Sequence, residues 1–126
     1  MKRFALVVLL VAAACSCGKD HGTAPARFDV TALPAPVDLA VEPGPEQATL
    51  TWSYPLESRA CVREFRLYYY FEVFDVIEPI ASTEDTFFVD TRLVGNLQYC
   101  YVVSAVDTNG IEGWRTSAVC ALIETK

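Results

Sequence analysis

Apolar and polar residues alternate in two stretches of the chain, and this period of two predicts β-strands. Residues 48–54 place Leu50 and Trp52 on one face, with threonine or serine on the other, because successive side chains of a strand point to opposite faces. Residues 99–106 alternate in the same way. Both stretches are therefore expected to be strands with one face buried.

Further short runs of strand-forming residues follow one another at intervals of about ten residues. They cover residues 37–41, 62–74 with a bend toward Ile77, 86–91 and 116–123. Residues rich in Pro, Gly, Asn and Asp separate them at 42–45 and 107–110. No stretch has a helical period of useful length. The pattern predicts an all-β protein, a seven-stranded antiparallel immunoglobulin-like β-sandwich.

Four segments give the sequence a resemblance to the fibronectin type III family, over residues 33–124. Residues 99–107 carry the pattern Tyr-x-Tyr-x-Val-x-Ala-x-Asp that members of the family have, and a Gly-containing loop follows. The proline-led residues 34–39 match the first strand, the Leu-x-Trp of residues 48–52 matches the second, and residues 65–69 resemble the third. The resemblance implies a fibronectin type III domain over residues 34–126; another immunoglobulin-like sandwich is the alternative.

The alternation and the resemblance place the same side chains in the core. These are Leu50, Trp52, Phe65, Leu67, Tyr99, Tyr101, Val103 and Ala105. The resemblance also implies that Tyr99 is the tyrosine corner, whose hydroxyl bonds to a backbone group of the preceding connection.

The first residues form a targeting pattern. Lys2 and Arg3 precede an apolar run that ends in three alanines, and Cys15 follows at once. The run is far shorter than the roughly 20 residues of a membrane-spanning helix. The segment is similar to a bacterial lipoprotein signal, which implies that residues 1–14 are removed and that Cys15, or alternatively Cys17, receives lipid. Ordinary secretion and, less favoured, a cytoplasmic location are the alternatives.

Residues 15–33 are expected to be a flexible tether between the lipid and the domain. They contain glycine, proline and scattered charges, without apolar periodicity. Neither Ser16 nor Gly18 is the Asp that often retains such proteins at the inner membrane. The expected location is therefore the bacterial cell envelope, with the outer membrane favoured.

The charge of the chain argues against nucleic acid as a partner. The chain has 10 basic and 16 acidic residues and a formal net charge of −6. Without Lys2 and Arg3, 8 basic residues remain and the net charge becomes −8. A chain this acidic repels nucleic acid and anionic lipid head groups.

Three cysteines lie in the predicted domain. In the fold that the resemblance implies, the last two strands are antiparallel neighbours, and Cys100 and Cys120 lie at the same end of the sheet. We therefore expect a Cys100–Cys120 disulfide in the oxidising environment of an exported protein. The fate of Cys61 stays open: it either remains a thiol or bonds to Cys17 across the tether.

The sequence offers little for catalysis. The one histidine, His21, lies in the tether, so the domain cannot pair it with a nucleophile. Acidic residues occur in pairs near turns, Asp107 with Glu112 and Glu84 with Asp85, where solvated carboxylates are ordinary. There is no Cys-x-x-Cys motif. We expect no enzyme activity, no metal and no cofactor.

Two surfaces are candidates for binding. Outward-facing Tyr68 and Tyr70, with Val102 and Val106 beside them, would form a partly apolar patch for a protein, unless they only stabilise the sheet. Trp114, in the loop after the sixth strand, would stack on a sugar, fill a protein pocket or cap the core. The sequence thus predicts a monomeric, non-catalytic module that contacts proteins at the cell surface. A glycan-binding accessory protein and a structural spacer are the alternatives.

Overall fold

A computed structural model describes residues 32–126. The predicted signal peptide, both candidate lipidation cysteines and most of the predicted tether lie outside this part of the chain. The elements, in chain order, are β1 (Val37–Gly44), β2 (Gln47–Ser53), α2 (Leu56–Arg59), β3 (Val62–Phe71), β4 (Val76–Thr83), β5 (Phe87–Asp90), β6 (Gln98–Asp107), β7 (Glu112–Arg115) and β8 (Val119–Leu122).

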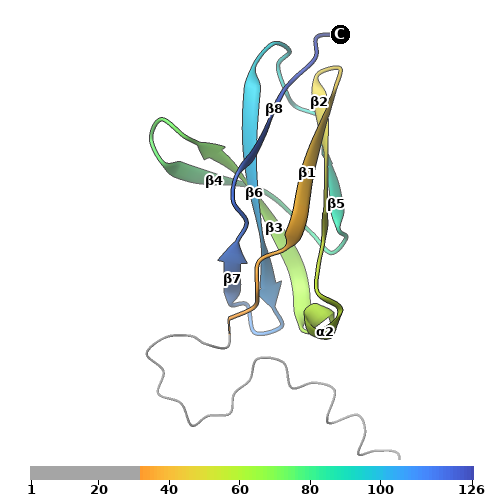
Figure 1. The fold of residues 1–126 in the computed structure, drawn as a ribbon, viewed down its shortest axis with the longest axis vertical. Helices are drawn as coiled ribbons and strands as arrows, with labels where there is room; N and C mark the ends of the chain where they lie inside the picture. Colours follow the sequence, from red (N-terminus) through yellow and green to blue (C-terminus); the bar gives the residue numbers. More distant parts are fainter. Residues whose placement is uncertain (1–31) are drawn as a thin grey trace, which may run out of the picture.

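The strands form two antiparallel sheets that pack as a sandwich (Figure 1). One sheet has the order β1-β2-β5; the other has the order β4-β3-β6-β7, with β8 pairing to β6 as well. The predicted all-β sandwich is therefore confirmed. The hairpin of β3 and β4 projects to one side of the sandwich (Figure 1).

The core lies between the sheets and contains the side chains that the alternation selected. Leu50, Trp52, Phe65, Leu67, Tyr101, Val103 and Ala105 are buried in it, and Tyr99 packs against it. The Tyr99 hydroxyl accepts a hydrogen bond from the backbone N–H of Val94 at 3.0 Å. That bond to the preceding connection is the one a tyrosine corner makes.

The end of the chain differs from the prediction. Residues 107–115 were expected to form a loop, yet residues 112–115 of this segment are β7. The predicted closing strand over residues 116–123 begins only at Val119, as β8. The reason is the length of β6: β7 pairs with its second half, and β8 pairs with its first half.

The long aromatic strand also divides differently. The chain turns after Phe71, where the N–H of Phe74 donates to the Phe71 carbonyl at 3.1 Å. Asp75 takes a positive φ of 52°, a left-handed conformation that Asp and Asn tolerate better than most residues. The returning strand β4 then runs to Thr83, well beyond the predicted second strand near Ile77.

The N-terminal segment is held on the sandwich before β1 begins. Leu33, the last residue of the predicted tether, is buried in the core. Its carbonyl accepts a hydrogen bond from the N–H of Trp114 at 3.0 Å. A Cβ added at Gly113 would lie 2.4 Å from the Leu33 oxygen, so only glycine allows this close passage.

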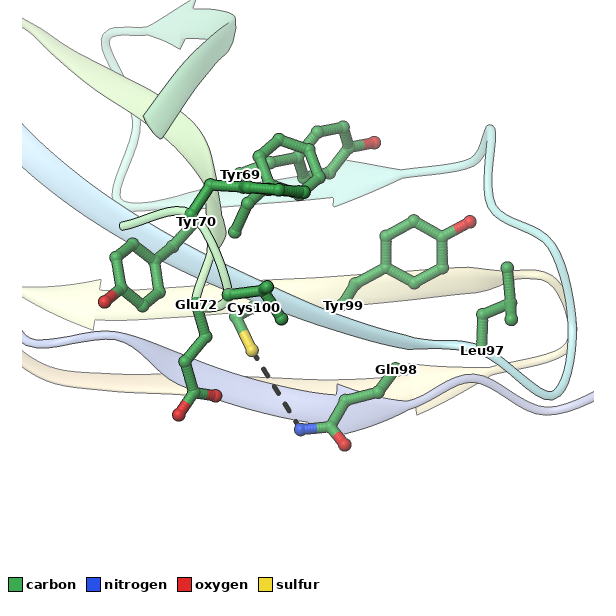
Figure 2. A pocket seen from close by; sticks show the side chains of 10 residues that line it. Tyr69, Tyr70, Glu72, Leu97, Gln98, Tyr99 and Cys100 are labelled. Atoms are coloured by element: carbon green, nitrogen blue, oxygen red, sulfur yellow. Dashed lines mark hydrogen bonds between the residues drawn. The ribbon is translucent and has the colours of Figure 1, made fainter. Parts of the chain in front are cut away.

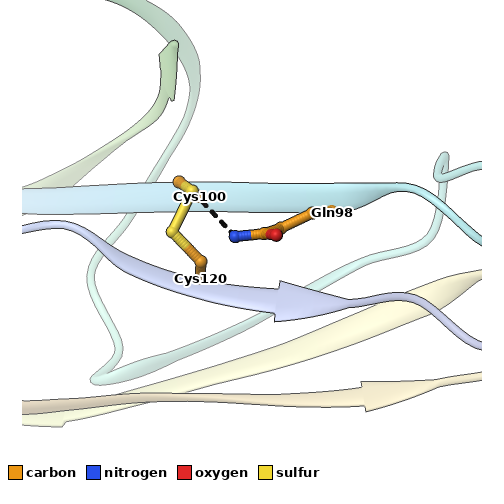
Figure 3. The surroundings of a disulfide bond; sticks show 3 residues. All are labelled: Gln98, Cys100 and Cys120. Atoms are coloured by element: carbon orange, nitrogen blue, oxygen red, sulfur yellow. Dashed lines mark hydrogen bonds between the residues drawn. A yellow bond between two sulfur atoms is a disulfide. The ribbon is translucent and has the colours of Figure 1, made fainter. Parts of the chain in front are cut away.

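The disulfide Cys100–Cys120 links β6 to β8, as predicted (Figure 3). The two cysteines lie directly opposite each other in the strand register. The Nε2 of Gln98 lies 4.0 Å from the Cys100 sulfur. Cys61 is buried directly before β3 and is itself disulfide-bonded, so the thiol alternative is wrong. The alternative bond to Cys17 involves a residue outside the described part.

Candidate functional site

Three of the four residues of the patch predicted on the outer face of the larger sheet are buried. Tyr68 and Val102 are direct neighbours on this face, as the alternation predicted, but both are buried. Val106 is also buried. Two long side chains with charged ends, Arg66 of β3 and Arg115 of β7, belong to the same face, and Arg115 covers the Tyr68 ring.

Glu112 of β7 joins these side chains into one polar cluster. Its carboxylate accepts hydrogen bonds from the hydroxyl of Tyr68 at 2.6 Å and from the hydroxyl of Ser104. Arg66 and Arg115 lie 3.8 and 3.7 Å from the same carboxylate. The Arg115 guanidinium also lies over the Tyr68 ring, 5.3 Å from its centroid. Because Glu112 lies on β7, Tyr68 on β3 and Ser104 on β6, these hydrogen bonds hold β7 against β3 and β6.

The surroundings of Glu112 favour its charged form. Burial opposes ionisation and by itself raises the pKa of Glu112. The hydrogen bonds from Ser104 and Tyr68 and the charges of Arg115 and Arg66 act the other way and hold the pKa below the ordinary value of a glutamate. The cluster therefore stabilises the folded state while Glu112 is ionised.

Replacing Glu112 with Gln is expected to reduce the free energy of unfolding by about 1 kcal/mol at pH 7. Because the folded-state pKa of Glu112 is lowered, this contribution is present above the ordinary pKa and is lost as the pH falls through the folded value. The difference between wild type and Glu112→Gln should therefore shrink at pH 3. Urea unfolding at both pH values measures it, with the exposed Glu42→Gln as control. An equal difference at both pH values would contradict this role.

Four exposed apolar side chains lie together at the tip of the β3–β4 hairpin, residues 71–76. Val73 is 86% exposed and Phe74 is 74% exposed, and Phe71 and Val76 are exposed beside them. The sequence did not mark these residues as a site, since a run of Val and Phe next to tyrosines is typical of a buried strand. The signal that was available is the acidic residues at 72 and 75 within the run, which predict a turn.

Tyr70 is half-buried at the base of this tip. Its hydroxyl donates to a carboxylate oxygen of Asp75 at 3.1 Å. This hydrogen bond raises the pKa of Tyr70 above its ordinary value. Of the four residues of the predicted patch, Tyr70 is thus the one that belongs to an accessible surface.

A groove of about 460 Å³ runs beside the tip, between the end of β3 and the start of β6 (Figure 2). Its walls are mainly aromatic and aliphatic, from Tyr69, Phe71, Phe74, Leu97 and Tyr99. Glu72 is the one charged residue among its lining residues. Cys100 is one of its lining residues (Figure 2), and its disulfide to Cys120 (Figure 3) ties this part of the groove to β8.

A buried carboxylate, Asp90, holds Tyr69, one of the residues that line the groove, in position from within the sandwich. Its side chain accepts hydrogen bonds from the hydroxyls of Tyr69 at 2.8 Å and Tyr101 at 3.0 Å, and from the backbone N–H of Arg92 at 3.3 Å. Burial raises the pKa of both tyrosines, and the neighbouring carboxylate raises it further. These hydroxyls stay protonated at neutral pH and donate to Asp90, so the cluster positions Tyr69 rather than performing acid–base chemistry.

Solved structures share this arrangement of strands. The fibronectin type III domain of human fibronectin type III domain containing protein 3 superposes with a TM-score of 0.66 at 17% identity, covering 83% of this chain and 94% of that one. A Fn3-like protein from Clostridium thermocellum superposes with a TM-score of 0.61 at 25% identity, covering 75% of this chain and 96% of that one. The chain has a fibronectin type III fold.

Longer proteins contain the same fold as one part. A β-1,2-glucanase from Parabacteroides distasonis matches with a TM-score of 0.64 and 24% identity over 76% of this chain. The chain spans 13% of the length of that glucanase and 17% of the length of the twitchin kinase region from C. elegans. No protein-family model and no curated protein matches the sequence. These comparisons therefore establish the fibronectin type III fold and nothing narrower.

Two of the four acidic residues near turns, Asp107 and Glu112, use their carboxylates in structural hydrogen bonds within this fibronectin type III fold. Asp107 accepts hydrogen bonds from the backbone N–H groups of Asn109 and Ile111 at 2.8 and 2.9 Å and so shapes the turn after β6. Glu112 belongs to the cluster described above. Residues 32–126 contain no group of three or more His, Cys, Asp or Glu side chains that would hold a metal ion. They also contain no helix long and apolar enough to cross a membrane.

Trp114 lies on β7 with its indole 66% exposed, so it does not cap the core. The backbone N–H of Trp114 donates a hydrogen bond to the Leu33 carbonyl. This bond holds Trp114 beside the segment that leads into β1. Among the exposed apolar side chains of the described residues, two surfaces remain candidates for binding: the hairpin tip with its groove, and the indole of Trp114.

Proposed function

We propose that this chain is an exported, lipid-anchored module that contacts another protein through the tip of the β3–β4 hairpin, without catalysis. The observation that carries the proposal is the exposure of Val73 and Phe74 on a hairpin that projects from a rigid sandwich (Figure 1). Exposed, contiguous apolar side chains on a soluble domain are typical of interaction surfaces. The fibronectin type III fold by itself is compatible with many partners.

The hairpin tip replaces the sheet face around Tyr68 as the expected contact surface. Tyr68 has its hydroxyl satisfied by Glu112 and its ring covered by Arg115. A partner that approached this face would have to separate that cluster. Phe74 has no such cover, so binding there removes apolar area from water without breaking an existing hydrogen bond.

A photo-reactive phenylalanine analogue at position 74 tests the proposal in cells that make the protein. We expect a crosslinked product at position 74 and none when the analogue replaces Thr51, which is exposed on the outer face of the other sheet. No product at position 74, or equal products at both positions, would contradict the proposal and would favour a spacer.

The anchor is proposed from the sequence around Cys15 and Cys17. The intact mass of the protein from its own membranes should show a lipid addition on one of them and the loss of the preceding residues. An unmodified chain that begins at Met1 would remove the anchor from the proposal and would leave the hairpin contact to be judged by crosslinking alone.

Glycan binding through Trp114 is a second candidate, because an exposed indole offers a flat apolar face that can stack on a sugar ring. Trp52, the other tryptophan, is buried, so added oligosaccharide should change the fluorescence of Trp114 selectively. If oligosaccharides leave the fluorescence unchanged while an aqueous quencher reaches Trp114, the glycan candidate fails.

A further inference from the structure

The charged residues on and around the hairpin are all acidic. Between Arg66 and Arg92 there is no Lys or Arg. Three acidic residues of this stretch, Glu72, Asp75 and Glu78, lie on the hairpin itself. Within residues 32–126 none of the three takes part in a salt bridge. The apolar tip is therefore bordered by negative charge that no ion pair within residues 32–126 neutralises.

This border selects among the possible occupants of the tip and groove. Anionic lipid head groups would be repelled by it. A second copy of the chain joined tip to tip about a two-fold axis would bring the same carboxylates together. A surface with positive charge beside apolar side chains would instead meet complementary charge at both the tip and the groove.

We infer that the partner contributes a segment in which apolar side chains are flanked by Lys or Arg. The inference rests on the proposed function, because it specifies the chemistry of the partner at the same surface. The apolar side chains would lie in the groove against Phe74 and against Leu97 and Tyr99 (Figure 2). The basic side chains would lie against Glu72, which lines the groove, and Glu78, which follows on β4.

The test uses two labelled synthetic heptapeptides, one of alternating Leu and Lys and one of alternating Leu and Glu, with the full-length protein. We expect the Leu–Lys peptide to bind at least about tenfold more tightly than the Leu–Glu peptide in fluorescence anisotropy. Raising the salt concentration should weaken the binding of the Leu–Lys peptide, because salt screens the attraction between charges in a solvent-exposed contact. Equal binding of the two peptides would overturn the inference.

Matched variants separate this site from general attraction to an acidic protein. The double variant Glu72→Gln with Glu78→Gln should bind the Leu–Lys peptide about tenfold more weakly than the wild type does. Glu42→Gln with Glu57→Gln changes the net charge equally, at exposed positions on β1 and α2, and should have little effect. Phe74→Ser should also weaken binding, whereas Leu56→Ser, at a side chain that is 83% exposed, should not. Equal effects of the two double variants would overturn the inference.

The crosslinking at position 74 distinguishes the two levels of the proposal. A protein adduct that forms equally well with Glu72→Gln and Glu78→Gln keeps the proposed function and overturns the basic partner. An adduct with lipid, or with a second copy of this chain, overturns the inferred occupant in the same way. The absence of any adduct contradicts the proposed function itself.

Discussion

Asp90→Ala is expected to lower the free energy of unfolding by about 3 kcal/mol. The Asp90 side chain is 3% exposed and accepts hydrogen bonds from two tyrosine hydroxyls and one backbone N–H. Alanine would leave the Tyr101 hydroxyl without an acceptor in the interior, where an unsatisfied polar group is costly. It would also release Tyr69, whose ring packs against Tyr99 and Tyr101 at centroid distances of 5.7 and 5.5 Å.

Three further variants distinguish this explanation from a simple loss of packing. Asp90→Asn keeps the size and one acceptor oxygen and should lose less stability than Asp90→Ala. Tyr101→Phe and Tyr69→Phe each remove one donor and should cost about 1–2 kcal/mol. Urea unfolding measures all four, and Tyr101→Phe should reduce the additional cost of Asp90→Ala because the two residues interact directly. Fully additive effects would show that the hydroxyl–carboxylate bond is not the cause.

Removing the Cys100–Cys120 disulfide is expected to cost about 3 kcal/mol, as Cys100→Ser with Cys120→Ser. The bond closes a loop with a sequence separation of 20 residues, and a cross-link of this length restricts the unfolded chain by about that amount in the chain-entropy description. The double variant is preferable to a reductant, because Cys61 is also disulfide-bonded and would be reduced at the same time.

Urea unfolding of the double variant gives both quantities that the explanation requires. The free energy of unfolding should fall, and the dependence on urea should steepen because the unfolded chain becomes more expanded. A variant that loses less than about 1 kcal/mol would show that the cross-link constrains little. Since Cys100 borders the groove, the same variant should also bind the Leu–Lys peptide more weakly.

The strands and the core could be predicted because they depend on short-range pattern. Alternation along β2 and β6 identifies which side chains share a face. The face with the larger apolar side chains is the one that packs between the sheets. The disulfide also followed from the order of strands once the fold was inferred. Strand ends were predicted less well: β7 was taken for a loop, because Glu112, Gly113 and the arginine at 115 do not form an apolar pattern.

The candidate site could not be predicted in the same way. Alternation placed Tyr68 and Val102 on the outer face, but it contains no information about what covers that face. Arg115 reaches Tyr68 from β7, a contact between positions far apart in the sequence that depends on the register of three strands. Exposure therefore has to be read from the assembled sheet.

The sequence by itself determined that this chain is a β-sandwich with a core around Trp52 and Tyr101, because side-chain alternation and turn residues act over a few positions. Only the tertiary structure decided which apolar residues meet solvent. Phe74 is of a type usually found in a core, yet it is exposed. It lies on the β3–β4 hairpin, which projects away from the sandwich, so that no second sheet covers it (Figure 1). Burial depends on how all the strands assemble, whereas the formation of each strand depends largely on residues that are close in the sequence.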